Sequence, residues 1–118
     1  SRSEMSHGKE WVISTQGQAA TQAAHQVLLE GGNIIDAAIA ASFTISVERP
    51  HSSGLGGGGF LIYREAKTKK IMVFDFRERA PQRAHSRMYL DIENQVIKNL
   101  SITGNLSVAV PGLVKGLE

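Results

Sequence analysis

The chain has 118 residues, of which 42% are hydrophobic and 20% charged, and its net charge is +2. This composition predicts a packed core, while scattered basic residues and a single tryptophan argue against a nucleic-acid-binding surface. The lack of cysteine excludes disulfides, thiolate metal sites and a cysteine nucleophile. No run of apolar residues reaches the ~20 that a membrane-spanning helix requires.

The first predicted elements are a strand and a helix. Residues 11–14 are typical of a short buried strand. From Ala19 onward, apolar residues recur at intervals of three and four, which indicates a helix. Gly31 and Gly32 should end this helix, because glycine readily adopts the left-handed conformation that follows a helix C-terminus.

A second helix is predicted over residues 34–47. Asn33 is its expected N-cap, and Asp36 supplies an acidic group in the first turn. The helix is apolar around nearly its whole circumference, which predicts burial on every side. The other predicted elements are too few to cover it, so we expect further packing partners outside this chain.

The segment Pro50–Phe60 contains four consecutive glycines, Gly56, Gly57, Gly58 and Gly59. Glycine permits positive φ and close approach of backbone, so this run indicates a tight crossing beside a buried element. Residues 54–59 formally satisfy the G-x-G-x-x-G pattern, but a helix precedes them and a strand follows, the reverse of a dinucleotide-binding fold. Cofactor binding by the loop is therefore disfavoured.

A β-hairpin is predicted after the glycines, from strands at residues 60–64 and 71–76. The following residues, 77–104, are polar and irregular, with a short helix expected near residues 87–91. Another strand is expected at residues 107–110, and Leu113 should begin a helix.

Two sites along the chain carry polar residues that could take part in chemistry. Arg77 follows an apolar strand, where its guanidinium could hold a carboxylate through two hydrogen bonds, although a solvated surface position is the common alternative. His51, Ser52 and Ser53 suggest a nucleophile and base, but adjacent residues rarely face one another, and hydrogen bonding to the loop backbone is the favoured interpretation. The histidines show no metal-ligand spacing.

Four blocks of the sequence resemble the N-terminal part of γ-glutamyltranspeptidases, in the family's order. They are Gly31-Gly32-Asn33-x-x-Asp36-Ala37-Ala38, Pro50-His51-Ser52-Ser53-Gly54-Leu55-Gly56-Gly57-Gly58-Gly59-Phe60, Asp75-Phe76-Arg77-Glu78-x-Ala80-Pro81 and Ser107-Val108-Ala109-Val110-Pro111-Gly112-Leu113-Val114-x-Gly116-Leu117.

The resemblance implies an α+β fold, the αββα sandwich of N-terminal-nucleophile hydrolases. Residues 1–118 would be the N-terminal portion of the large subunit, an incomplete domain. Such precursors cleave themselves, and the new N-terminal threonine of the small subunit then attacks γ-glutamyl amides such as glutathione and passes the glutamyl group to water or an amino acid. No cofactor is implied.

The resemblance also assigns individual roles. Arg77 would bind the α-carboxylate of the substrate, and the Gly56–Gly59 run would support the site from behind. The partner would be the small subunit, and the nucleophilic threonine would lie outside this chain. The implied location is periplasmic or extracellular, although no signal segment is visible.

Three other interpretations remain open at this point. The parent protein could be a related acylase acting on β-lactams or poly-γ-glutamate, although Arg77 favours substrates with a free α-carboxylate. It could instead be a catalytically inactive scaffold or interaction module. A nucleotide-binding protein is the least favoured.

Overall fold

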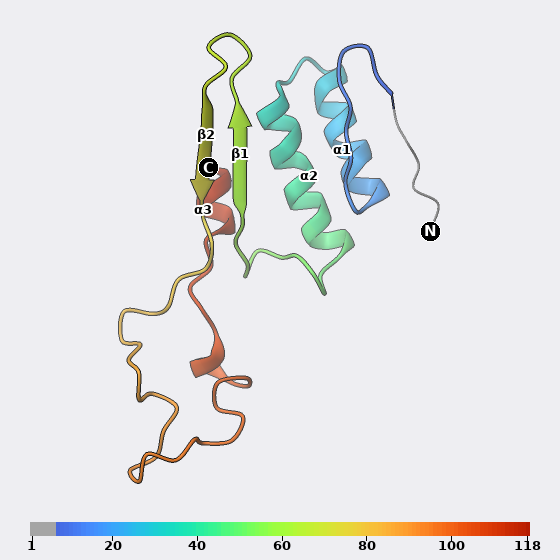
Figure 1. The fold of residues 1–118 in the computed structure, drawn as a ribbon. Helices are drawn as coiled ribbons and strands as arrows, with labels where there is room; N and C mark the ends of the chain where they lie inside the picture. The colour runs from blue at the N-terminus through green and yellow to red at the C-terminus, as the bar shows by residue number, and fades with distance from the viewer. Residues whose placement is uncertain (1–6) are drawn as a thin grey trace. The chain divides into compact units, whose positions relative to one another are not determined.

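A computed structural model describes residues 7–118, which form two compact units that divide after Leu55 (Figure 1). The helices of the first unit are α1 (Gln18–Leu29) and α2 (Ile34–Glu48). The second unit contains β1 (Phe60–Arg64), β2 (Ile71–Asp75), the short 3₁₀ helix η1 (Asn105–Ser107) and α3 (Leu113–Leu117).

The first unit is a pair of helices packed side by side (Figure 1). Its buried apolar side chains are small, Ala20 and Ala24 from α1 and Ala37 from α2. Alanine at the contact lets two helix backbones approach closely, and it loses no side-chain entropy on burial.

The connection between the helices has the geometry that the sequence predicts. Gly31 has φ +90°, the left-handed conformation expected after a helix C-terminus. Asn33 Oδ1 accepts hydrogen bonds from the backbone N–H groups of Ile35 (2.7 Å) and Asp36 (3.1 Å). Asp36 Oδ2 in turn accepts from the Asn33 N–H (2.9 Å), which completes a capping box.

The N-terminus of α1 is capped from the other helix. Its own N-cap residue, Gly17, has no side chain to accept a hydrogen bond, and the Glu48 carboxylate at the end of α2 accepts from Ala19 N–H (3.3 Å) and Ala20 N–H (3.1 Å). A Cβ at Gly17 would overlap this carboxylate. A negative charge also stabilises the positive end of the helix dipole, so this contact ties the two helices together.

The strand predicted at residues 11–14 is wrong. The segment is not paired with any strand in the described part of the chain. Instead it lines a cavity of about 360 Å³ together with Leu28, Ala37 and other residues of the two helices. The apolar run therefore lies against the helices, and a strand needs a hydrogen-bonding neighbour that these residues do not have among residues 7–118.

Burial of α2 on every side is also not observed within this chain. Of its residues, Ala37 and Ser46 are buried, whereas Val47 is 82% exposed and Ile34 is 58% exposed. The helix itself is confirmed, but large apolar side chains on it, Ile34, Phe43 and Val47, remain exposed in the described part of the chain.

The predicted hairpin is confirmed. Strands β1 and β2 pair antiparallel, with Phe60 opposite Asp75 and Arg64 opposite Ile71. Lys69 adopts positive φ (62°) in the connecting turn. The sheet has only these two strands in the described chain, and large apolar side chains remain exposed along one face (Phe60, Ile62, Ile71 and Val73).

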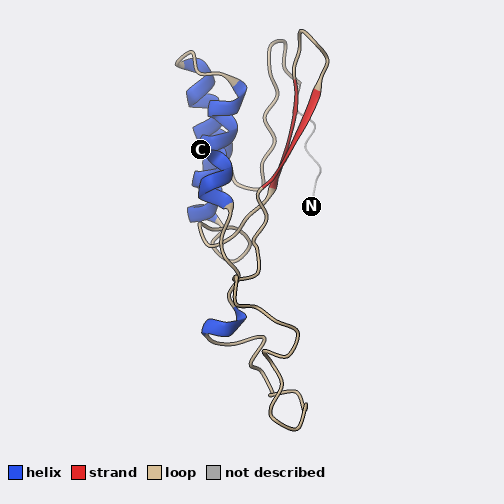
Figure 2. Cartoon of the chain, turned by 90° about the vertical axis from the view of Figure 1, so that its left-hand side faces the viewer, coloured by secondary structure: helices blue, strands red, loops and turns tan. Residues whose placement is uncertain are grey.

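Most of residues 77–112 form a long loop, as Figure 2 shows. The predicted helix near residues 87–91 is wrong. The N–H groups of Met88 and Leu90 donate to the carbonyl oxygens three residues earlier, His85 O and Arg87 O, which is the pattern of turns and not of an α-helix. The predicted strand at residues 107–110 is wrong too, since η1 covers its start and only Val110 pairs. Val110 and Arg79 exchange two backbone hydrogen bonds (2.8 and 3.0 Å), which close the base of the loop.

Replacing the cap residue should weaken the first unit. We expect Asn33→Ala to lower the free energy of unfolding by about 1 kcal/mol, because it leaves the N–H groups of Ile35 and Asp36 without their acceptor. Equilibrium denaturation of the full-length protein measures the change. Asn33→Asp retains an acceptor oxygen and should stay close to the parent; an equal loss in both variants would contradict the capping role.

Residues 1–118 produced alone should expose the apolar side chains of α2 and of the hairpin. We expect them to bind a hydrophobic dye, to aggregate and to melt without a sharp transition, whereas the full-length protein should not. Dye fluorescence and thermal melts of the two proteins measure this difference. A cooperative melt of the short chain without aggregation would show that it needs no further cover.

Candidate functional site

Three segments of the second unit meet where β2 ends. Gly59 and Phe76 exchange backbone hydrogen bonds (3.4 and 3.0 Å), which extend the hairpin ladder by one pair. Gly57 O accepts from the N–H groups of Gly112 and Leu113 (both 3.0 Å) at the start of α3. The glycine loop therefore holds both the end of the hairpin and the beginning of α3.

The glycines are needed here for close approach. A Cβ on Gly58 would lie 2.5 Å from Phe76 O and 2.8 Å from both Arg77 Cα and Glu78 N, distances at which atoms overlap. Gly59 faces the Phe76 ring, whereas Gly56 has no atom within 4 Å of a Cβ position. None of these three glycines adopts positive φ. The left-handed conformation therefore does not explain why glycine occupies these positions.

Arg77 lies two residues beyond β2 and directly after the Phe76 peptide. Its N–H donates to Asp75 Oδ1 (3.1 Å), which fixes the turn of the backbone at the strand end. Its Nε is 3.7 Å from Glu78 Oε2, and its guanidinium carbon is 6.0 Å from the centre of the Phe60 ring. The side chain is 66% exposed, so the guanidinium keeps donors free for an anion.

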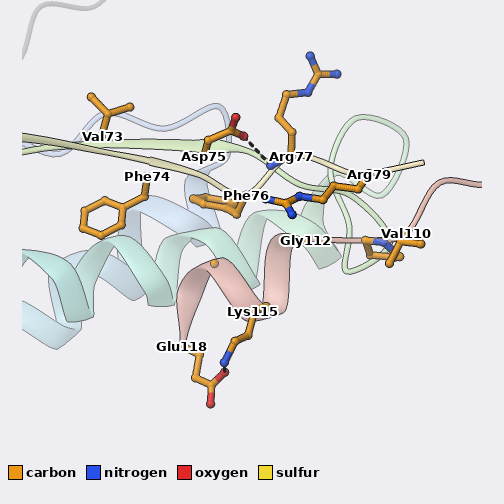
Figure 3. Close-up of a pocket in the computed structure, with 12 residues that line it drawn as sticks. Val73, Phe74, Asp75, Phe76, Arg77, Arg79, Val110, Gly112, Lys115 and Glu118 are labelled. Carbon is orange, nitrogen blue, oxygen red and sulfur yellow. Dashed lines mark hydrogen bonds and ion pairs between the residues drawn. The ribbon is translucent and has the colours of Figure 1, made fainter. Parts of the chain in front are cut away.

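A cavity of about 760 Å³ surrounds this junction. Figure 3 shows Phe76 at its centre, between the end of β2 and helix α3. The Arg77 side chain points away from α3, whereas Arg79 lies alongside Phe76. Lys115 and Glu118, on the far side of α3, are paired with one another. The side chains of Arg77 and Arg79 therefore lie on different sides of the junction, and of these two it is Arg77 that points away from it.

The other predicted candidates make local contacts. The backbone N–H groups of Ser52 and Ser53 both donate to Arg49 O (3.1 and 3.0 Å), and the Ser52 hydroxyl lies 3.5 Å from the same oxygen. Only Ser52 thus approaches backbone with its side chain, and the same interpretation of His51 and Ser53 stays a prediction. Within residues 7–118, no cluster of histidine, aspartate or glutamate has the arrangement of a metal site. Among the helices described, none is long and apolar enough to cross a membrane.

Sequence reasoning missed two residues of the junction. Gly112 is part of the fourth block of the family resemblance but received no structural role from the sequence, yet a Cβ there would overlap the Phe76 carbonyl. Gly116, one turn later on α3, faces the Phe76 ring just as closely. The spacing of the two glycines places them on one face of a helix, and this was the available signal.

Comparison with known proteins gives one consistent match. The Gamma-glutamyltranspeptidase family matches residues 20–118. The glutathione hydrolase proenzyme of Bacillus subtilis strain 168 is 42% identical over 112 residues, which are 94% of this chain and 19% of that protein. The chain thus spans about a fifth of the length of this curated relative.

Solved structures agree with the sequence match. The γ-glutamyltranspeptidase of Helicobacter pylori is 37% identical with a TM-score of 0.88, over 97% of this chain and 32% of that one. The transpeptidase CapD of Bacillus anthracis is 26% identical with a TM-score of 0.69, over 93% and 32%. These neighbours confirm the α+β class and the N-terminal-nucleophile hydrolase fold, of which this chain carries a part. The chain belongs to the γ-glutamyltranspeptidase family.

Proposed function

We propose that the complete protein is a γ-glutamyltransferase and glutathione hydrolase, and that this chain supplies the group that binds the substrate's α-carboxylate. The observation that carries the proposal is Arg77, an exposed guanidinium on a backbone held by the glycine loop. The block Asp75–Pro81, in which this arginine sits, lies within the region that matches the family.

The chemistry of Arg77 suits this task. A guanidinium presents parallel N–H donors that match the two oxygens of a carboxylate, and it remains charged at any physiological pH. The contact to Glu78 is long (3.7 Å, through Nε), which leaves the terminal N–H groups available. Arg77 can therefore orient a γ-glutamyl compound by its free α-carboxylate. The γ-amide, at the other end of the glutamyl group, is then left accessible to a nucleophile.

The reaction itself requires groups beyond this chain. By membership of the family, a threonine hydroxyl at the N-terminus of a small subunit would attack the γ-carbonyl, and the amine would leave with a proton. The resulting ester would then pass its glutamyl group to water or to an amino acid. The small subunit of the same precursor is thus the proposed partner, and export to the periplasm or the cell exterior is the proposed location.

The Gly56–Gly59 run has a supporting role in this proposal. It contacts Phe76 and the backbone of Arg77 but contributes no side chain that could touch a substrate. A related enzyme of the same superfamily is the second candidate function, because the chain is also similar to the transpeptidase CapD. The higher TM-score and identity to the H. pylori enzyme favour the γ-glutamyltransferase.

Arg77→Ala in the full-length protein should weaken binding of γ-glutamyl substrates. Loss of a charge-assisted pair costs about 2–5 kcal/mol when the pair is buried in the complex, so KM for γ-glutamyl-p-nitroanilide should rise at least tenfold. Steady-state kinetics measure the change. Arg64→Ala, at the turn end of the hairpin, is the control and should behave like the parent. Unchanged KM and kcat in Arg77→Ala would refute the assignment.

The full-length product should cleave itself. Intact-mass spectrometry before and after incubation at neutral pH should show one precursor replaced by two chains, the smaller beginning with threonine. Because the new α-amino group forms only on cleavage, activity should appear together with the smaller chain. A product that folds but never divides would support the inactive scaffold instead.

A further inference from the structure

We propose that Gly112 and Gly58 are positioning residues for Arg77, which together hold the peptide that precedes it. This inference rests on the proposed function, because it concerns how accurately Arg77 is presented to a substrate carboxylate. Neither glycine has a side chain with which to touch a substrate, and the proposed effect acts through the position of Arg77.

The two glycines reach the same carbonyl group from different segments. A Cβ on Gly58 would be 2.5 Å from Phe76 O, and a Cβ on Gly112 would overlap that oxygen and lie 2.8 Å from the Phe76 carbonyl carbon. The contacts continue into the next residue. Gly58 would meet Arg77 Cα at 2.8 Å, and Gly112 would meet Arg77 O at 3.0 Å.

The Phe76 ring is held just as closely. A Cβ on Gly116 would overlap the root of the ring at Cβ and Cγ, and one on Gly59 would lie 2.9 Å from its outer edge at Cε2. The glycine loop and the start of α3 therefore enclose both the side chain of Phe76 and its carbonyl. The peptide between Phe76 and Arg77 has little freedom to rotate away from an added methyl group.

Hydrogen bonds connect these close contacts. Gly57 O accepts from Gly112 N–H (3.0 Å), and Gly59 O accepts from Phe76 N–H (3.0 Å). The loop, the strand end and the start of α3 thus share one set of backbone bonds, and moving any one of them moves Arg77. A displacement of about 1 Å can cost a hundredfold when it misplaces a group that orients the substrate.

The test is a double-mutant cycle in the full-length protein, with KM and kcat for γ-glutamyl-p-nitroanilide as readouts. Gly112→Ala should raise KM about tenfold or more while kcat changes less, because binding through Arg77 is lost in both ground and transition states. In an Arg77→Ala background, the same substitution should have almost no further effect on KM. This dependence on Arg77 separates positioning from general destabilisation.

Matched variants complete the design. Gly58→Ala repeats the test from the other segment, and Gly54→Ala is the control, since no described atom beyond its own chain neighbours lies within 4 Å of its Cβ position. Circular dichroism and thermal melts show whether each variant folds. Equal effects of Gly112→Ala with and without Arg77 would overturn the proposal, as would folding failure of both Gly58→Ala and Gly112→Ala.

The outcomes also separate this inference from the proposed function. If Arg77→Ala itself leaves KM unchanged, the carboxylate-binding assignment fails and the positioning role falls with it. If Arg77→Ala raises KM but Gly112→Ala and Gly58→Ala do not, the proposed function stands and only the positioning role is refuted.

Discussion

The contact on which the second unit depends is the close approach of three backbone segments at the Phe76 carbonyl. Loop 56–59, the end of β2 and the start of α3 meet there with glycine at the crowded positions. Packed protein interiors do not yield to an added methyl group without strain, so these positions tolerate only hydrogen as a side chain. The conformational entropy that glycine loses on folding is the cost of this arrangement.

In the first unit, small residues likewise allow close contact between segments that are distant in sequence. Its helices pack through alanines, and the N-terminus of α1 receives its acceptor from Glu48 rather than from its own cap residue. Gly17 leaves room for that carboxylate, as Gly58 leaves room for a carbonyl. In both units a missing side chain allows a polar group from a distant part of the sequence to reach its partner.

The exposed apolar surface has a direct structural meaning. Val47 on α2 and Ile62 on β1 are more than two-thirds exposed, although each belongs to a well-formed element. Helices and strands form by local hydrogen bonding, but their stability in water comes from covering an apolar face. The chain covers only 19% of its B. subtilis relative. Exposed apolar faces are expected in such a part of the fold, because the αββα sandwich packs further layers against its helices and strands.

The sequence by itself determined the elements that depend on neighbouring residues. The capping box at Asn33, the left-handed Gly31 and the hairpin follow from interactions within a few positions, and so does the placement of Arg77 beyond a strand. The family resemblance was also visible, because its four blocks are local patterns.

Only the tertiary structure decided which distant groups meet. Residues 11–14 are apolar like a buried strand but lie against helices, and Val110 forms a single bridge to Arg79 where a strand was predicted. The role of Gly112 depends on a carbonyl 36 positions earlier, at Phe76, which no local pattern specifies. Periodicity reports the conformation that a segment favours, whereas the identity of its neighbour depends on the path of the whole chain.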